Sequence, residues 1–404
     1  MSGRTGRNSA TQAQPERVML VGVMLDKDDT GSNAARLKTV QTGSNAARLN
    51  GFQTALAEAV ELVKAAGGDS VRVETAKRDR PHTALFVGTG KAAELSEAVA
   101  ADGIDLVVFN HELTPTQERN LEKILQCRVL DRVGLILAIF ARRARTQEGR
   151  LQVELAQLSH LAGRLIRGYG HLQSQRGGIG MKGPGETKLE TDRRLTAHRI
   201  NALKKQLANL KKQRALRRKS RESGRIKTFA LVGYTNVGKS SLFNRLTKSG
   251  IYAKDQLFAT LDTTARRLYI SPACSIILTD TVGFVSDLPH KLISAFSATL
   301  EETAQADVLL HVVDAAAPNS GQQIEDVENV LQEIHAHDIP CIKVYNKTDL
   351  LPSEEQNTGI WRDAAGKIAA VRISVAENTG IDALREAIAE YCAAAPNTDE
   401  TEMP

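Results

Sequence analysis

Two parts of the 404-residue chain alternate short apolar runs, each about the length of a strand, with longer amphipathic segments. The clearer pattern is in the C-terminal part. Its apolar runs lie at residues 228–232, 276–280, 308–313, 341–345 and 371–374, before an expected helix at 381–392. Continuous apolar runs are typical of strands buried on both faces of a parallel sheet. The pattern therefore predicts a doubly wound α/β domain over residues 226–393.

A smaller α/β domain is predicted at residues 18–140. Its strands are expected at 19–25, 70–74, 84–87 and 106–109, and its helices at 54–66, 92–101 and 116–125. Gly88-Thr89-Gly90-Lys91 superficially resembles a phosphate-binding loop, but the long glycine spacing and the final Ser or Thr are missing, which favours a turn. Residues 30–41 recur at 42–53 with nine of twelve positions matching. Two copies are too few for a solenoid, so a local duplication is the simplest explanation.

Between these domains, two helical patterns flank a glycine-rich segment. Their apolar seams consist of Leu151, Leu155, Leu158, Ala162 and Leu165, and of Ile200, Leu203, Leu207 and Leu210. Spacings of three and four residues put each set on one helix face, and two such helices in series predict an antiparallel hairpin over residues 141–225. The glycine-rich tip at 177–187 is either a flexible turn or a place where backbone can approach a phosphodiester. The tails, 1–17 and 394–404, are expected to be disordered.

Positive charge is concentrated in one segment. Residues 193–227 hold 14 Lys and Arg against the single acid Glu222, a charge of +13, so that the rest of the chain carries +6 − 13 = −7. Such a concentration is typical of nucleic-acid contact, whereas a solvated helix face usually alternates signs. Binding to an anionic membrane stays open, although the segment lacks apolar bulk. The candidate RNA contacts are Arg176, Gly177, Gly178, Lys182, Lys204, Lys205, Lys211, Lys212, Arg217 and Arg218.

The remaining composition excludes several classes of protein. The four cysteines are far apart, which is neither a disulfide framework nor a zinc site, and indicates buried thiols in a reducing compartment. No apolar run reaches the length of a membrane span, and residues 1–17 lack the apolar core of a signal peptide. A soluble, monomeric, cytoplasmic protein is expected.

A phosphate-binding loop follows the first strand of the C-terminal domain. Its G-x-x-x-x-G-K-S residues are Gly233, Tyr234, Thr235, Asn236, Val237, Gly238, Lys239 and Ser240. Backbone N–H groups, the Lys239 ammonium and the positive end of the next helix would bind a triphosphate, and the Ser240 hydroxyl would bind Mg²⁺ directly. The preceding strand and the following helix are the context that this motif requires.

Three further segments extend this site. Asp280, Thr281, Val282 and Gly283 form a D-x-x-G sequence in which Asp280 can hold Mg²⁺ through water and Gly283 N–H can reach the γ-phosphate. After the strand at 341–345 comes an N-K-x-D signature, Asn346, Lys347, Thr348 and Asp349, which resembles the guanine-binding element of GTPases. Its carboxylate can accept two hydrogen bonds from guanine, whereas adenine would leave it unpaired. The weakest match is to a fifth GTPase element, at Ser374, Val375 and Ala376.

The chain as a whole resembles the HflX family of ribosome-associated GTPases over roughly residues 18–393. The resemblance is carried by the segments 140–158, 177–194, 256–262 and 280–284, of which the glycine-rich one is particular to that family. It implies a P-loop GTPase domain preceded by a smaller α/β domain and a helical linker. It also implies action at the large ribosomal subunit, splitting or rescuing stalled ribosomes under stress. The alternatives are an ATP- or GTP-dependent RNA-remodelling factor and a ribosome-assembly scaffold with a weak GTPase.

The same resemblance places switch I at Phe258, Ala259, Thr260, Leu261 and Asp262, with Thr260 as the second direct Mg²⁺ ligand. The sequence alone does not choose among Thr260, Thr263 and Thr264. The family often has a proline after the aspartate, where this chain has Thr263.

Phe284 stands where Ras-like GTPases have the glutamine that orients the attacking water. A phenyl ring cannot form that hydrogen bond, so no catalytic side chain is assigned. Hydrolysis is expected to be slow alone and faster with a partner.

Overall fold

The computed structural model describes residues 15–26, 45–168, 184–222, 226–248, 257–258, 260–272, 274–285 and 297–394. Side chains are described in these ranges except at 45–47, 165–168, 184–189, 214–222, 297–299 and 394. The chain divides into two compact units, Met1–Ile136 and Leu137–Pro404. None of the described helices is both long enough and apolar enough to cross a membrane.

The first unit contains a parallel four-stranded sheet in the order β2-β1-β3-β4. Its strands are β1 (Arg17–Leu25), β2 (Asp69–Arg78), β3 (Leu106–Phe109) and β4 (Arg128–Leu130). The inner strand β1 is buried along most of its length, whereas the edge strand β2 alternates between half-buried and exposed residues. This difference follows from position, because only an inner strand is covered on both faces and both edges.

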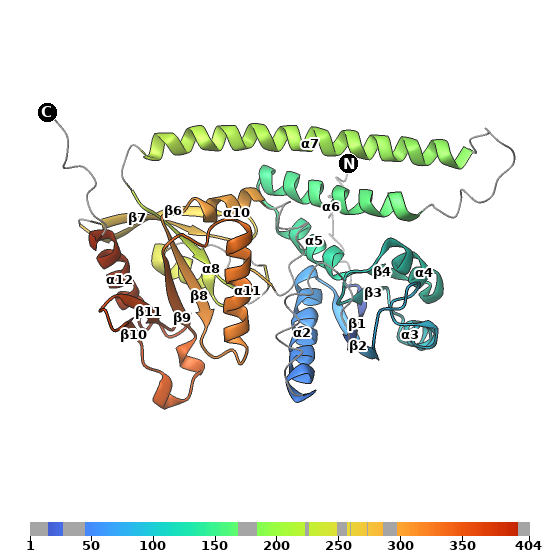
Figure 1. Ribbon diagram of the computed structural model, residues 1–404, viewed down its shortest axis with the longest axis horizontal. Coiled ribbons are helices and arrows are strands. Elements are labelled where there is room, and N and C mark those ends of the chain that lie inside the picture. The colour runs from blue at the N-terminus through green and yellow to red at the C-terminus, as the bar shows by residue number, and fades with distance from the viewer. Residues whose placement is uncertain are drawn as a thin grey trace, which may run out of the picture. The chain divides into compact units, whose positions relative to one another are not determined.

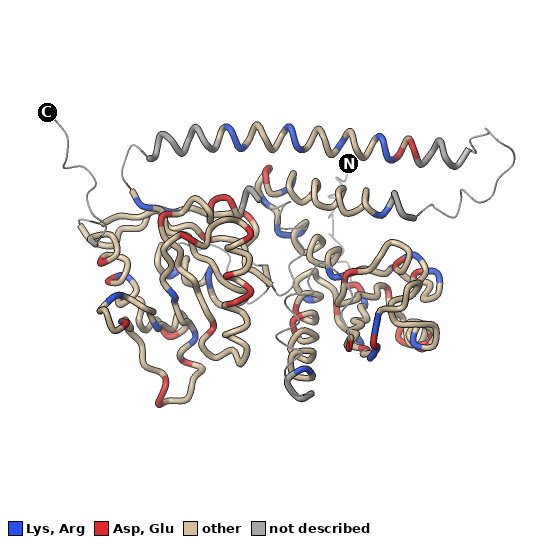
Figure 2. The backbone as a smooth tube through the Cα atoms, in the orientation of Figure 1, with Lys and Arg blue, Asp and Glu red and all other residues tan. Residues whose placement is uncertain are grey.

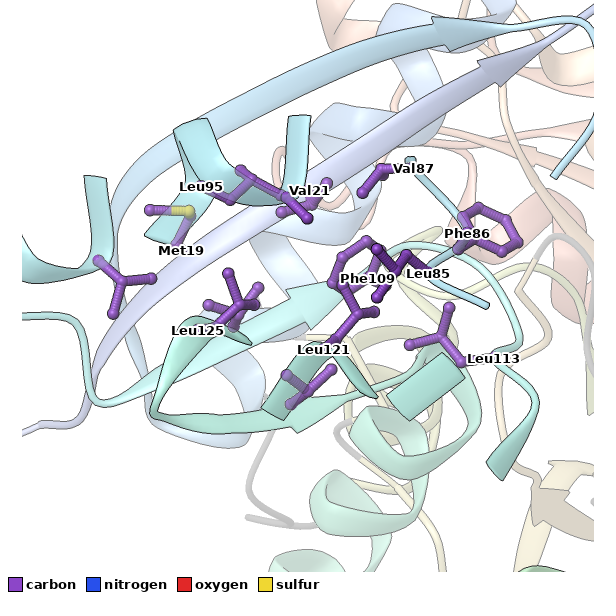
Figure 3. Packing of buried hydrophobic residues seen from close by; sticks show 14 of the residues in the cluster. Met19, Val21, Leu85, Phe86, Val87, Leu95, Phe109, Leu113, Leu121 and Leu125 are labelled. Carbon is purple, nitrogen blue, oxygen red and sulfur yellow. The ribbon is translucent and has the colours of Figure 1, made fainter. Parts of the chain in front are cut away.

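Three helices accompany this sheet, and they are α2 (Asn45–Ala66), α3 (Thr89–Asp102) and α4 (Pro115–Leu125). Helix α5 (Arg132–Arg143) begins in this unit and continues past Ile136 into the second. Helix α4 begins with a capping box in which the Thr114 hydroxyl accepts from Gln117 N and the Gln117 side chain accepts from Thr114 N. Figure 3 shows the core of this unit, where Met19 and Val21 of β1 pack with Phe109 of β3 and with leucines of α3 and α4.

Two predictions for this unit need correction. Residues 84–87 are not a strand: they lie in a turn closed by an isolated bridge between His82 and Phe86, although Leu85, Phe86 and Val87 are buried in the core. Thr89, Gly90 and Lys91 are not a turn either, because they form the first residues of α3, with Gly88 as the N-cap. Strand β4 was not predicted.

The second unit contains a seven-stranded sheet in the order β10-β11-β9-β8-β5-β7-β6. Its strands are β5 (Thr228–Val232), β6 (Thr264–Ser271), β7 (Cys274–Asp280), β8 (Val308–Asp314), β9 (Cys341–Asn346), β10 (Gly359–Arg362) and β11 (Ile368–Arg372). The five central strands pair in parallel, and β6 and β10 add to the edges in antiparallel orientation. The sequence predicts the central strands but neither edge strand, and β11 ends at Arg372 rather than at 374.

Helices cover both faces of this sheet. The elements are α8 (Lys239–Thr247), α10 (Ser297–Ala304), α11 (Ser320–Glu333) and α12 (Ile381–Ala394), with short 3₁₀ turns η2 (Thr348–Leu350) and η3 (Ser353–Glu355). Helices α10 and α11 share a buried cluster with β5 and β8, and Figure 1 shows α11 lying over the strands. Helix α12 contacts α8 through a hydrogen bond from Arg385 to Leu246 O of 3.3 Å.

Two long helices precede the sheet within the same unit. Helices α6 (Gln147–Gly168) and α7 (Pro184–Glu222) run side by side in opposite directions (Figure 1). Leu203 of α7 is fully buried, and Arg199 of α7 forms an ion pair with Glu154 of α6 at 2.6 Å. At 39 residues, α7 is roughly 58 Å long. The predicted fold class is confirmed: a doubly wound sheet preceded by a smaller α/β unit and a helical hairpin. Residues 177–183 of the predicted glycine-rich tip lie outside the described residues, and residues 184–187 form the start of α7.

Candidate functional site

The loop between β5 and α8 requires glycine at both ends. Gly233 has a φ of 147°, and a Cβ there would lie 2.2 Å from Val312 O on the neighbouring strand β8. Gly238, the N-cap of α8, has a φ of 94°, and a Cβ there would lie 2.4 Å from Asn346 Nδ2. Both backbone angles are rare for residues with a side chain. The loop therefore packs directly against β8 and β9 at the carboxyl edge of the sheet.

Lys239 lies buried beneath this loop. Its Nζ donates to Gly233 O at 2.9 Å and to Tyr234 O at 2.6 Å. Burial lowers the pKa of Lys239 to about 8, and the nearby Asp280 carboxylate only partly opposes that shift. An ammonium held this way lacks a full counter-charge, and a phosphate group would supply one.

Three oxygen-bearing side chains converge beside Lys239. Asp280 Oδ2 accepts hydrogen bonds from Ser240 Oγ and Thr260 Oγ1, both at 2.8 Å, and the two hydroxyls are 2.7 Å apart. Asp280 is 1% exposed, and its other oxygen, Oδ1, has no hydrogen-bond partner. Burial raises the pKa of Asp280, while the two hydroxyl hydrogen bonds oppose that effect. A buried carboxylate with an orphaned oxygen between two hydroxyls has the hard oxygen donors that Mg²⁺ prefers.

Other cation sites have less support. Among the described residues, no three His, Cys, Asp or Glu side chains gather in a group that could hold a metal ion. All four cysteines are free, but the expectation of buried thiols is wrong: Cys127, Cys274 and Cys392 are half-buried and Cys341 is exposed. The oxygen set of Ser240, Thr260 and Asp280 is thus the metal candidate, as the sequence predicts.

The D-x-x-G segment is fixed to the phosphate-binding loop by backbone hydrogen bonds. Phe284 N donates to Gly233 O at 3.1 Å, and Thr235 N donates to Phe284 O at 2.7 Å. A Cβ on Gly283 would lie 2.8 Å from Thr235 Cγ2 and 3.0 Å from Lys239 Nζ, so this residue closely approaches the loop. Thr281 Oγ1 donates to Leu231 O, and Val282 is nearly buried.

The Phe284 ring lies in the apolar core. It is 1% exposed and belongs to the cluster formed by β5, β8, α10 and α11, which includes Leu300 and Leu309. This side chain therefore packs under the sheet edge instead of facing a reacting phosphate.

Asn346 joins the phosphate-binding loop to the segment after β11. Its Nδ2 donates to Val237 O at 2.8 Å, and its Oδ1 accepts from Val375 N at 3.1 Å. The side chain is 2% exposed. The Asn346 side chain thus joins two loops whose contact residues, Val237 and Val375, are 375 − 237 = 138 residues apart in the sequence.

The rest of the N-K-x-D segment is equally constrained. Asp349 Oδ1 accepts from Ser374 Oγ at 2.5 Å, and that hydroxyl also accepts from Glu377 N at 3.1 Å. Thr348 donates through Oγ1 to Ile373 O, and Lys347 forms an ion pair with Asp314 at 2.8 Å. Ser374 and Val375 are buried, whereas Ala376 is exposed. The structure thus brings the 346–349 and 374–376 segments together, and Ser374 orients the Asp349 carboxylate.

The basic helix is described in part. Figure 2 shows Lys and Arg spaced along α7. Lys204, Lys205 and Lys212 are exposed, whereas Lys211 forms an ion pair with Glu301 of α10 at 3.0 Å. The side chains of Arg217 and Arg218, and all of Arg176, Gly177, Gly178 and Lys182, lie outside the described residues.

A separate pocket of about 400 Å³ lies in the first unit, at the start of α3. Two of the cations that line it are already engaged. Lys91 forms ion pairs with Glu74 and Glu94, and Arg78 donates to Val87 O. We therefore assign no ligand to this pocket.

Three known sequence families match consecutive parts of the chain. They are described as "GTP-binding GTPase N-terminal" at residues 53–141, "GTP-binding GTPase Middle Region" at 143–221 and "50S ribosome-binding GTPase" at 228–347. GTPase HflX of Escherichia coli (strain K12) is 53% identical over 335 residues, which cover 83% of this chain and 78% of that protein. The chain belongs to the HflX GTPase family.

Other comparisons agree with this HflX assignment. GTPase HflX of Magnetococcus marinus is 46% identical over 330 residues, 81% of this chain and 76% of that protein. A solved structure described as "crystal structure of SsGBP and GDP complex" has a TM-score of 0.51 at 22% identity, covering 93% of this chain and 98% of its own, which shows a shared fold. As an HflX family member with a GTPase domain, the chain binds guanine nucleotide and hydrolyses GTP.

Switch I makes a second set of contacts that the resemblance to the family does not predict. Leu257, Phe258 and Leu261 are buried, and the Asp262 carboxylate accepts hydrogen bonds from the linker at Thr146. Ala259 lies outside the described residues. Thr146 lies in segment 140–158, one of the segments that carry the resemblance to HflX. That resemblance indicated a function for this segment, whereas its helical periodicity predicted only packing.

Proposed function

We propose that this HflX family member is a GTP-driven switch that binds the large ribosomal subunit and its RNA and helps to split or rescue stalled ribosomes. The observation that carries the proposal is the convergence of three elements at one sheet edge: the phosphate-binding loop, the Ser240–Thr260–Asp280 oxygen set and the Asp349–Ser374 pair. The family description "50S ribosome-binding GTPase" supports the choice of partner. Such a role belongs in the cytoplasm.

The nucleotide would be held at both ends. The backbone of residues 233–240 and the Lys239 ammonium would bind the phosphates, with Gly283 N–H close to the terminal one. At the other end, Asp349 would accept from the two guanine donors, and the backbone of residues 374–376 would contact the base. The hydrogen bond from Ser374 holds the carboxylate in place before guanine binds.

The oxygen set would hold Mg²⁺, with Ser240 and Thr260 as direct ligands and Asp280 acting through water. The ion would supply charge stabilisation for phosphoryl transfer. The buried Asp280 Oδ1, which has no hydrogen-bond partner, is the acceptor that would serve this water-mediated role.

Hydrolysis is expected to be slow until a partner acts. The Phe284 ring is buried in the core and cannot orient water. We assign the stimulating role to the ribosome, whose RNA would contact the exposed lysines of α7. The series of Lys and Arg along α7 (Figure 2) favours a polyanionic partner.

Nucleotide variants test the first half of the proposal. Lys239→Ala is expected to abolish tight nucleotide binding, and Asp349→Asn to weaken GTP specifically. Competition of labelled GTP by unlabelled GTP and ATP measures both effects. An unchanged preference for GTP over ATP in Asp349→Asn would count against the guanine assignment.

Ribosome binding tests the second half. Co-sedimentation with large subunits, using a non-hydrolysable GTP analogue across a salt series, should show binding that falls steeply as salt rises. Replacing Lys204 and Lys205 by glutamine should reduce the slope of log K against log salt by roughly 1.5, since each phosphate contact contributes about 0.7 to 0.9. The matched control replaces the exposed Lys123 and Lys367, and should leave the slope unchanged. Equal GTP hydrolysis with and without large subunits would refute ribosomal stimulation.

A further inference from the structure

Switch I is attached to the start of helix α6 by a compact set of hydrogen bonds. Asp262 Oδ2 accepts from Arg145 N at 2.7 Å and from Thr146 N at 2.9 Å, and Oδ1 accepts from Thr146 Oγ1 at 2.5 Å. Both carboxylate oxygens are thus directed at the linker. We call Thr146, Gly149 and Asp262 the switch anchor.

The anchor is shaped for this contact. Thr146 Oγ1 accepts from Gly149 N at 2.9 Å, so the same hydroxyl caps α6 and donates to the carboxylate. A Cβ on Gly149 would lie 2.2 Å from Asp262 Oδ1 and 3.1 Å from Thr146 Oγ1. Any larger residue at position 149 would therefore push the carboxylate away.

An aromatic contact lies beside the anchor. The Phe258 ring of switch I meets the Phe140 ring edge-on, with 4.7 Å between centroids, and both rings are at most 2% exposed. Phe258 has a φ of 53°, which is uncommon for a residue with a bulky side chain. Switch I thus keeps an unfavourable backbone angle while its ring is packed against the C-terminal half of α5.

On its other side, switch I reaches the metal candidate. Thr260, two residues before Asp262, shares hydrogen bonds with Ser240 and Asp280. We propose that Thr146 and Asp262 are positioning residues for GTP hydrolysis: by fixing switch I to α6, they hold the Thr260 hydroxyl where Mg²⁺ requires it. This inference rests on the proposed role of Thr260. Because α6 packs against the basic helix α7 in the helical hairpin, a ligand that fixes the hairpin would also fix switch I.

Three variants disturb the anchor in different ways. Thr146→Ala removes the hydroxyl, Asp262→Asn weakens the acceptor, and Gly149→Ala displaces the carboxylate while keeping both partners. Thr146→Ser is the conservative variant that restores the hydroxyl. The matched control is Thr196→Ala, because Thr196 Oγ1 only donates to Asp192 O within α7.

The assays are GTP hydrolysis without ribosomes, the Mg²⁺ concentration that gives half-maximal rate, and GDP affinity, all on the full chain. The anchor variants should lower kcat about tenfold and raise the Mg²⁺ requirement at least about threefold, since small misplacements at a reacting site cost up to about a hundredfold. GDP affinity should change less than about twofold, because the anchor is proposed to position groups for hydrolysis and not to bind the nucleotide. Thr146→Ser and Thr196→Ala should behave like the unmodified protein.

Thr260→Ala tests the magnesium role of Thr260 separately from the positioning role of the anchor. If it lowers kcat and raises the Mg²⁺ requirement but the anchor variants do not, the positioning role is refuted and the magnesium site stands. If Thr260→Ala itself leaves the Mg²⁺ requirement unchanged, both fail. A loss of GDP affinity in every anchor variant, equal to the loss for GTP, would show that the contacts merely maintain the fold.

Discussion

Replacing Asn346 by alanine should destabilise the second unit and weaken nucleotide binding together. The side chain is buried and forms two hydrogen bonds, to Val237 O at 2.8 Å and from Val375 N at 3.1 Å. Val237 and Val375 are themselves at most 8% exposed, so water cannot readily replace the lost partner. Truncation leaves one buried carbonyl and one buried N–H unpaired, each at a cost of about 1 to 3 kcal/mol. The expected loss is therefore about 2 to 6 kcal/mol.

The single tryptophan makes this loss measurable in one unit. Trp361 lies on β10 of the second unit, half exposed, with Arg372 5.1 Å from its ring. Its fluorescence during urea unfolding of the full chain reports the unit that contains Asn346. The midpoint should fall with an unchanged slope, and added GDP should restore less stability than in the unmodified protein.

Two controls make the result interpretable. Asn120→Ala removes a comparable hydrogen bond, to Ala84 O at 3.1 Å, but in the first unit, and should leave the Trp361 transition unchanged. Asn346→Asp keeps an acceptor for Val375 N while losing the donor to Val237 O, and should also bind GDP more weakly. A loss below about 1 kcal/mol in Asn346→Ala, with unchanged GDP affinity, would refute the bracing role.

Three further predictions concern the same unit. Burial lowers the pKa of His311 to about 4, so the unfolded chain takes up a proton first as pH falls, and the stability contributed by neutral His311 is lost as pH falls through 6.5. The free energy of unfolding, followed by Trp fluorescence, should drop by roughly 1.4 kcal/mol between pH 7.5 and 5.5, and this drop should disappear in His311→Gln. Phe284→Gln places an amide in the apolar core and should cost about 3 kcal/mol without raising the rate of phosphate release; a faster rate would contradict the buried position. Gly233→Ala should lower stability by at least about 2 kcal/mol because its Cβ would collide with Val312 O, whereas Gly321→Ala, at an exposed position of α11, should raise it by about 0.5 to 1 kcal/mol.

The central strands of the second unit could be predicted because each is an apolar run covered on both faces. Edge strand β6 could not, because among its eight residues only Leu268 is buried, and its sequence shows neither a long apolar run nor a strict alternation of apolar and polar residues. The reverse error occurred at Leu85, Phe86 and Val87, which are apolar and buried without belonging to a sheet. Apolar character reports burial, whereas strand formation also needs a backbone partner, which a single sequence does not identify.

In the helical linker, too, the sequence pattern predicted only part of the buried surface. The predicted seam correctly includes Leu203, which is fully buried, but the most buried of the described side chains of α6 are Gln152 and Val153, which lie off the seam. Heptad spacing describes one contact face, and the start of α6 has a second face near switch I. The contact between Thr146 and Asp262 spans 116 residues, and no local pattern encodes it.

The pKa shifts of Lys239 and Asp280 indicate that these two residues form a ligand-binding site and not merely a structural ion pair. In a structural ion pair, the Asp carboxyl would have a lowered pKa and the Lys ammonium a raised one. Here burial has the opposite effect on both: it raises the pKa of Asp280 and lowers that of Lys239, and their mutual attraction does not reverse either shift. Both groups are thus less favourable as ions than they would be in water, which is characteristic of sites that exchange ligands. Phosphates would offset the cost at Lys239 and Mg²⁺ the cost at Asp280. Because Thr260 hydrogen-bonds to Asp280 and is close in the chain to Asp262, the same ligands would also fix switch I against the linker.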